Sequence, residues 1–259
     1  MLIFQKMWIG RSSAAGNGRS VNHRFTWRLR FFSLERLPRA GWDDWSVSMG
    51  KLITFEGGDG SGKSTQLRLT ADWLTSIGKR VITTFEPGDT QLGAKIRQLL
   101  LSGEDVPVPE CEMLLFLADR AQHVREVVQP ALQRGDWVLC DRYSDSTLAY
   151  QLAARKLGAA DELLRQMLTF AECGVTPDLT LWFDLPVSAA LERMRQRQQA
   201  GEKSTRLDDE ALSFHQRVTA AFASQAEAEP GRMMRVDAVG DIKSVEQQVH
   251  HIIRTRFSL

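Results

Sequence analysis

Residues 55–65 read FEGGDGSGKST, and this stretch decides the fold that we expect. It fits the phosphate-loop pattern G-x-x-x-x-G-K-[ST] at Gly57, Gly62, Lys63 and Ser64. A glycine-rich turn leaves the backbone bare enough to aim several N–H donors at a triphosphate, and the N-terminus of a following helix favours the same anion. The stretch therefore predicts a loop that binds nucleotide phosphates.

The flanking residues have the order that such a loop requires. Residues 52–55 predict a short strand, and residues 66–77 carry apolar side chains at helical spacing. The dinucleotide pattern G-x-G-x-x-G fails here, which argues against a nicotinamide cofactor. We expect Lys63 to reach the β- and γ-phosphates and the Ser64 hydroxyl to ligate Mg²⁺. The residues expected to contact the nucleotide are Gly57, Gly58, Asp59, Gly60, Ser61, Gly62, Lys63, Ser64 and Thr65.

Length and composition favour a single folded domain. The chain has 259 residues, 43% of them hydrophobic, which is enough for a sizeable core. Cys111, Cys140 and Cys173 are widely spaced and include no C-x-x-C pair, so neither a disulfide framework nor a zinc site is predicted. No stretch approaches the roughly 18 apolar residues of a membrane span. We expect a soluble protein whose function involves neither a membrane nor a nucleic acid.

Residues 1–48 differ from the rest of the chain. They hold eight basic and three acidic residues and four of the seven tryptophans, without a sustained helical or strand period. Three explanations are open: an in-frame upstream extension with Met49 as the true start, an organelle-targeting peptide, or a basic aromatic arm for nucleic acid or a membrane surface. We expect a disordered extension over residues 1–48 and one folded domain over residues 49–259.

Strands and helices alternate in the remainder of the chain. Further strands are predicted at 80–85, 137–141, 179–185 and 233–236. Helices are predicted at 91–101, 110–134 with a bend near Pro130, 146–157, 160–173, 186–199, 208–228 and 242–256, with a break at Gly158 and a polar lid loop at 199–205. This alternation predicts an α/β fold of the P-loop NTPase type: a five-stranded parallel sheet with helices on both faces and a helical lid. Ligands of such sheets bind at the carboxyl ends of the strands, where Glu86, Asp141 and Arg142 fall.

Several charged residues favour phosphoryl transfer over other phosphate-loop functions. The chain lacks the N-K-x-D motif of GTPases and the L-S-G-G-Q signature of transport ATPases. Asp141 and Arg142 end a strand, which suits a carboxylate near Mg²⁺ and a guanidinium that holds a second phosphate, although a surface ion pair is the alternative. Positions 58–61 carry no Arg or Lys, so a cation for the transferring phosphoryl group is expected from the lid. The lid region contains Arg193, Arg195, Arg197, Lys203 and Arg206.

Phe116 and Arg120 stand four residues apart, hence on one helix face. An aromatic ring beside a guanidinium is able to stack on a nucleobase and hydrogen-bond it. From the spacing alone, a core Phe next to a surface Arg is the commoner arrangement.

Together these segments resemble the bacterial type of the thymidylate kinase family, from Met49 to the C-terminus. The resemblance is carried by FEGGDGSGKST at 55–65, EPG at 86–88, LFLADR at 115–120 and DRYSDSTLAYQ at 141–151. It extends through PDLT at 177–180, FDLP at 183–186, RLD at 206–208 and FHQRV at 214–218. The phosphate loop is shared by many families, whereas the 141–151 segment is far more specific.

The resemblance implies transfer of the γ-phosphoryl group of ATP to dTMP, with Mg²⁺, in a cytosolic homodimer. It places Phe116 on the thymine and Arg120 at its carbonyl edge. The other substrate contacts that it implies are Glu86, Arg97, Arg142, Ser146, Thr147, Tyr150 and Gln151. Gly60 stands where one version of the family has a basic residue, so the chain resembles the version with a lid arginine. The expected catalytic residues are Lys63, Arg142, Asp59, Arg193, Arg197 and Arg206, and the expected metal ligands are Ser64 and Asp141.

The chain departs from the family pattern at one place. The family commonly has Arg before a Glu-Pro-Gly-Gly-Thr run, whereas Phe85 precedes Glu86 here and Asp89 replaces the second glycine.

Two rival functions stay open at this point. One is a kinase for another nucleotide, such as dUMP or a deoxynucleoside; the other is a non-catalytic nucleotide-binding protein that works through its basic tail.

Overall fold

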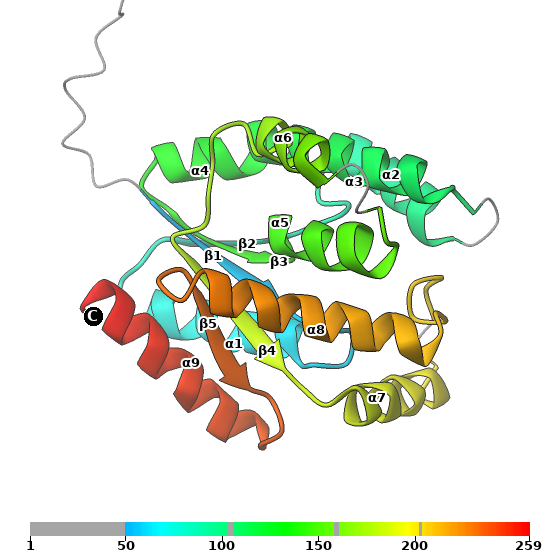
Figure 1. Ribbon diagram of the computed structural model, residues 1–259. Helices are drawn as coiled ribbons and strands as arrows, with labels where there is room; N and C mark the ends of the chain where they lie inside the picture. The colour runs from blue at the N-terminus through cyan, green and yellow to red at the C-terminus, as the bar shows by residue number, and fades with distance from the viewer. Residues whose placement is uncertain (1–49, 103–105, 158–160, 202–203) are drawn as a thin grey trace, which may run out of the picture. The chain divides into compact units, whose positions relative to one another are not determined.

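Five parallel strands form one sheet in the order β2-β3-β1-β4-β5 (Figure 1). They are β1 Lys51–Glu56, β2 Val81–Phe85, β3 Trp137–Asp141, β4 Leu179–Asp184 and β5 Met233–Asp237. The structure is a computed structural model that describes residues 50–259 except 103–105, 158–160 and 202–203. The predictions for residues 1–48, Gly158 and Lys203 therefore lie outside the described residues. The predicted five-stranded parallel sheet is confirmed.

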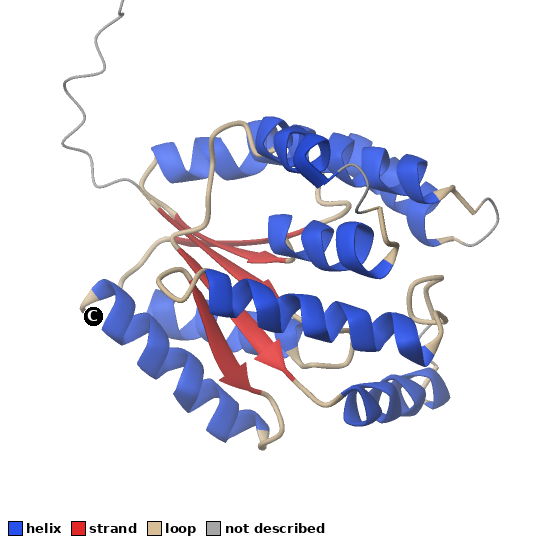
Figure 2. Cartoon of the chain, in the orientation of Figure 1, coloured by secondary structure: helices blue, strands red, loops and turns tan. Residues whose placement is uncertain are grey.

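Helices cover both faces of the sheet, as Figure 2 shows in blue around the red strands. On one face, Ile53 and Phe55 of β1 share a core with α1 (Lys63–Ser76) and α9 (Ile242–Phe257). On the other face, Leu52 packs in a core with the segment 124–132. Successive residues of a strand point to opposite faces, and both faces of β1 are buried, which explains why the consecutive residues Leu52 and Ile53 are both apolar.

The long helix predicted at 110–134 consists of three pieces. They are α3 (Pro109–His123), the π-helical turn η1 (Val124–Val128) and α4 (Gln129–Gln133). The Gln129 N–H bonds the carbonyl of Val124, five residues earlier. Pro130 has no N–H to donate to the carbonyl four residues before it, and the wider π-turn ends just before this proline. A second π-helical segment, η2 (Leu148–Ala154), follows α5 (Ser144–Thr147).

The predicted start of the helix at residue 208 is wrong, because α8 spans Leu212–Ala228. Residues 206–209 form a turn instead. The Asp208 carboxylate accepts the Thr205 N–H at 2.8 Å and the Thr205 hydroxyl at 2.8 Å, so a local turn takes the place of a first helical turn. The remaining helices, α2 (Gln91–Leu101), α6 (Asp161–Ala171) and α7 (Val187–Gln199), lie close to their predicted positions.

The architecture brings the carboxyl ends of β1, β2 and β3 to one edge. In the register of the sheet, Phe55 and Phe85 both pair with Asp141. The residues that follow these strands therefore meet above the sheet, as expected for parallel α/β folds. Within the described part of the chain, no helix has the length and apolarity needed to cross a membrane.

Candidate active site

The loop between β1 and α1 is shaped by glycines. Gly57, Gly60 and Gly62 have φ angles of 138°, 80° and 91°, which L side chains rarely adopt. A Cβ atom on Gly60 would lie 2.6 Å from the carbonyl oxygen of Ala190, so the loop packs directly on the start of α7. The sequence thus folds into a tight backbone turn immediately before the N-terminus of α1.

Lys63 and Ser64 occupy the positions that the phosphate-loop pattern assigns to them. The Lys63 ammonium donates to the carbonyl of Gly58 at 2.8 Å, so it curls back over the loop. Burial and the nearby charge of Arg142 lower the pKa of Lys63. The Ser64 hydroxyl donates to the Asp141 carboxylate at 2.7 Å. This contact joins α1 to the carboxyl end of β3. It places the oxygens of Ser64 and Asp141, the two expected metal ligands, side by side.

Arg142 is held above the loop in a left-handed backbone conformation, with φ at 71°. Its guanidinium donates to Asp59 at 2.7 Å and to the Gly57 carbonyl at 3.1 Å, and it lies 5.0 Å from the centre of the Tyr150 ring. Burial by itself raises the pKa of Asp59, but the charges of Arg142 and Lys63 outweigh it and hold that pKa below its ordinary value. A strained backbone that carries a preorganised cation is typical of functional sites.

A second group of side chains lies beyond Arg142, around Arg120 of α3. Arg120 is only 2% exposed, so the arrangement of a core Phe beside a surface Arg does not occur. Its Nε and Nη2 bond one carboxylate oxygen of Glu86 at 2.9 and 2.8 Å, and its Nη1 donates to the Thr147 hydroxyl at 2.8 Å. Phe116, one turn earlier, is half-buried.

Two expected substrate-binding residues are committed to protein partners. Both carboxylate oxygens of Glu86 are used, one by Arg120 and the other by His123 at 2.8 Å. The Gln151 amide nitrogen donates to the buried Glu112 at 2.8 Å. Glu86 and Gln151 nevertheless line the cavity described below, and Gln151 keeps its amide oxygen and one amide hydrogen for a ligand.

Arg97 of α2 comes from the opposite wall. It is exposed, donates to the Pro87 carbonyl at 2.7 Å and lies 5.6 Å from the centre of the Phe85 ring. Gly88 leaves room for the Arg97 stem, since a Cβ there would lie 2.7 Å from its Cδ. Phe85, the residue that departs from the family pattern, thus supplies a flat support for this cation.

The three expected lid arginines have different surroundings. Arg193 donates to the carbonyls of Ala238 at 3.2 Å and Gly60 at 3.5 Å, which ties α7 to the loop. Arg193 and Arg197 both line the cavity described next. Arg206 does not line it, because its guanidinium pairs with Glu112 and lies 3.2 Å from the Leu100 carbonyl. The arrangement gives no support to a catalytic role for Arg206.

One cavity of about 1440 Å³ joins these groups. Its lining includes almost all of the predicted site residues: Asp59, Gly60, Ser61, Gly62, Lys63, Ser64, Thr65, Glu86, Arg97, Phe116, Arg120, Asp141, Arg142, Ser146, Thr147, Tyr150, Gln151, Arg193 and Arg197. Gly57 and Gly58 shape the loop without lining the cavity. The cavity is also lined by four residues after β5 that were not predicted: Gly240, Asp241, Ile242 and Lys243. Their position after the carboxyl end of a strand was the available signal.

The fold and this cavity define an α/β enzyme of the phosphate-loop class whose cavity extends from the phosphate loop to a region lined by side chains of other elements. The family model for thymidylate kinase matches residues 55–249. Thymidylate kinase from a Cyanothece species is 45% identical over 223 residues, covering 80% of this chain and 94% of that protein. The enzyme from Nostoc punctiforme is 43% identical over 207 residues, covering 79% and 96%.

A solved structure agrees with these matches. The crystal structure of thymidylate kinase from Ehrlichia chaffeensis superimposes with a TM-score of 0.64 at 30% identity, covering 80% of this chain and 99% of that one. The chain therefore belongs to the thymidylate kinase family, which confirms the family predicted from the sequence. The reaction of this family is the transfer of a phosphoryl group from ATP to dTMP.

Proposed function

We propose that the cavity binds ATP at the phosphate loop and dTMP beside Phe116 and Arg120, and transfers the γ-phosphoryl group between them. The observation that carries this proposal is that both groups line one continuous cavity, with Arg142 between them. A phosphoryl donor and an acceptor held in one cavity meet the main requirement of this reaction, which is positioning with charge stabilisation.

The ATP end is supported by the loop and its neighbours. The glycine-shaped backbone presents N–H groups to the phosphates, and Lys63 supplies the charge next to the β- and γ-phosphates. Arg193 is pinned between the loop and the segment after β5, where Ile242 and Lys243 border the cavity. We place the adenine between Arg193 and that segment, because a guanidinium plane stacks well on an aromatic ring.

The residues present fit a magnesium ion. The described residues contain no group of three His, Cys, Asp or Glu side chains suited to a metal. Mg²⁺ in nucleotide enzymes commonly takes one carboxylate, water and phosphate oxygens, and the adjacent Ser64 and Asp141 oxygens match that requirement. Bound there, the ion would neutralise charge on the phosphates.

The dTMP end is supported by side chains from three elements. Phe116 offers a ring to the pyrimidine, and Arg120 and Thr147 offer polar groups to its edge. Arg97 and Arg142 flank the path to the phosphate loop and are suited to hold the 5′-phosphate. The Tyr150 hydroxyl lies 3.3 Å from Asp59, next to the position that we assign to the sugar.

The chemistry needs no strong general base. The nucleophile is a phosphate oxygen of dTMP, which is already anionic at neutral pH. Lys63 and Arg142 stabilise the charge that the transferring group develops, with Arg197 as the lid cation. Closing α7 over the site would exclude water and suppress ATP hydrolysis.

We also propose a homodimer, as the family resemblance implies. Leu114 of α3 is 53% exposed, and Leu163 and Phe170 of α6 are 58% and 83% exposed. Exposed apolar side chains on helices that pack against each other mark an interaction surface. Sedimentation of the full chain at micromolar concentration tests this, and a monomer would refute it.

The experiment that tests the function is a coupled ADP-release assay on the full chain with ATP and Mg²⁺. It offers dTMP, dUMP, UMP, dCMP, AMP and thymidine in parallel. We expect turnover with dTMP well above the others. A preference for another acceptor would support the rival kinase, whereas ATP binding without turnover of any acceptor would support a non-catalytic role. Repeating the assay on residues 49–259 tests our proposal that the extension is dispensable for catalysis.

A further inference from the structure

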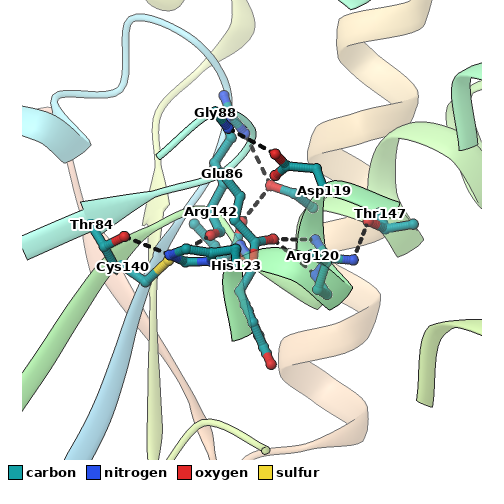
Figure 3. A network of polar contacts seen from close by, with 12 residues as sticks. Thr84, Glu86, Gly88, Asp119, Arg120, His123, Cys140, Arg142 and Thr147 are labelled. Carbon is teal, nitrogen blue, oxygen red and sulfur yellow. Dashed lines mark hydrogen bonds and ion pairs between the residues drawn. The ribbon is translucent and has the colours of Figure 1, made fainter. Parts of the chain in front are cut away.

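The buried network in Figure 3 links the carboxyl end of β2 to α3 through His123. His123 is fully buried at the end of α3. Its Nδ1 lies 2.8 Å from a carboxylate oxygen of Glu86, and its Nε2 lies 2.5 Å from the Thr84 hydroxyl. That hydroxyl also contacts the carboxylate of Asp89. The contacts thus run from Asp89 through Thr84 and His123 to Glu86, and from Glu86 to Arg120.

The hydrogen-bond donors and acceptors around His123 determine which of its ring nitrogens carry hydrogen. Carboxylates only accept hydrogen bonds, and a hydroxyl has one hydrogen to give. The Thr84 hydroxyl gives that hydrogen to Asp89, so His123 Nε2 must donate to the Thr84 oxygen. Glu86 is also an acceptor, because it is paired with Arg120, so His123 Nδ1 must donate as well. Both ring nitrogens then carry hydrogen.

The charges around the ring agree with this count. The titratable groups that surround it come from the end of β2 and the loop after it, from α3 and from the end of β3: Glu86, Asp89, Asp119, Arg120, Cys140 and Tyr143. Three of these six groups are carboxylates, and one, Arg120, is a permanent cation, which pairs with Glu86. A neutral ring would leave the buried carboxylates poorly compensated, whereas an imidazolium restores the balance.

We propose that His123 is an imidazolium that acts as a positioning residue: it fixes the Glu86 carboxylate, which in turn orients Arg120 toward the pyrimidine. The inference rests on the proposed function, since it assigns Arg120 to the base of dTMP. Arg120 has five N–H donors, of which Glu86 and Thr147 take three. Arg120 lines the cavity, and the direction of its remaining donors is set by how firmly Glu86 is held.

Asp89 is the residue of this network that determines the protonation of His123. The residue stands where the family pattern has glycine, and it is half-buried beside Thr84. With glycine at 89, the Thr84 hydroxyl would be free to donate to His123 Nε2, and a neutral ring protonated only at Nδ1 would satisfy every contact. Asp89, which departs from the family pattern, therefore determines the charge of the buried His123 ring. The Nε2 atom of that ring is linked to Asp89 through the Thr84 hydroxyl.

Nitrogen NMR of the histidine side chains in the full chain tests the protonation state without any substrate. His123 is assigned by the signal that His123→Gln removes. We expect both of its ring nitrogens to show N–H donor shifts at neutral pH, and Nε2 to become an acceptor in Asp89→Gly. A neutral ring in the wild-type protein would overturn the inference, as would a ring that stays doubly protonated in Asp89→Gly.

Steady-state kinetics tests the positioning role. His123→Gln should raise the KM for dTMP about tenfold, the size expected when a hydrogen bond to a charged group is lost, with kcat and the KM for ATP nearly unchanged. The matched control, His251→Gln, changes an exposed histidine of α9 and should leave all three constants unchanged.

Arg120→Lys separates this inference from the function on which it rests. If Arg120→Lys raises the KM for dTMP and His123→Gln does not, the positioning role is wrong and the proposed function stands. If neither variant changes it, the assignment of Arg120 to the pyrimidine fails, while the ring shifts still report the charge of His123.

Discussion

The two ends of the cavity are built by different means. The phosphate end is a stretch of consecutive residues whose glycines shape the backbone, with Lys63 curled over it. The pyrimidine end is assembled from side chains of α3, α5 and the segment after β2, held by hydrogen bonds that join residues 27 to 37 positions apart. Phosphates are alike in all nucleotides and are bound by a common backbone turn, whereas a base must be recognised by particular side chains.

This difference has a consequence for mutation. At the phosphate end, single residues act on the transferring group, so their loss should change kcat. At the pyrimidine end, several residues act through one another, so their loss should change the KM for dTMP in smaller steps. The predictions below test this contrast, starting with the largest effect.

Lys63→Ala should reduce kcat on the order of 10²-fold or more, as is typical when one electrostatic stabiliser of a transition state is removed. The coupled ADP-release assay measures it. Lys95→Ala, which changes an exposed lysine of α2, is the control and should retain full activity. Activity of Lys63→Ala within a factor of a few of wild type would refute the role of the loop.

Gly60→Ala should destabilise the fold by about 2 kcal/mol, because the added Cβ meets the Ala190 carbonyl and the φ angle of 80° disfavours any side chain. Gly58→Ala is the matched control, since a Cβ there has no atom within 4 Å. Urea unfolding of both variants gives the comparison. Equal stability of the two would show that backbone packing does not hold the loop.

Glu56→Gln should become more stable than wild type as the pH rises. Burial, and then the charge of Asp145, raise the pKa of Glu56 from 4.5 to about 8. A carboxyl group whose pKa is raised on folding stabilises the folded state fully below pH 4.5. This stabilisation is lost as the pH rises through about 8. Glutamine has no proton to lose, so the difference in unfolding free energy should grow by about 1 kcal/mol from pH 6 to pH 7.

A pH-independent difference between wild type and Glu56→Gln would contradict the raised pKa. The variant keeps the contacts of the protonated acid, since glutamine is able to accept the Tyr143 N–H and to donate to the Ser146 oxygen. The comparison therefore isolates the charge. Urea unfolding across the pH range measures it.

Phe85→Leu should raise the KM for dTMP about threefold, because the cation–π contact that supports Arg97 is worth only about 0.5–1 kcal/mol at an exposed site. Phe85→Tyr keeps the aromatic face and should behave like wild type. If Phe85→Leu also matched wild type, the Pro87 carbonyl alone would suffice to hold Arg97.

Some features of the molecule were predicted from the sequence and others were not. The phosphate loop, the strands and the family were all predictable, because each depends on residues close together in the sequence. The start of α8 was predicted four residues too early, since the Asp208 carboxylate caps a local turn instead. The ion pairs of Glu86 with Arg120 and of Arg206 with Glu112 were not predicted.

What the sequence determined by itself was the order of strands and helices, the parallel sheet, the phosphate loop and the membership of the thymidylate kinase family. Local spacing encodes these features, because backbone geometry responds to neighbouring residues. Only the tertiary structure decided which carboxylate holds which guanidinium. Arg206 meets Glu112 across 94 positions, and Glu86 holds both Arg120 and His123. Such pairings depend on how distant elements pack, and no local pattern specifies them.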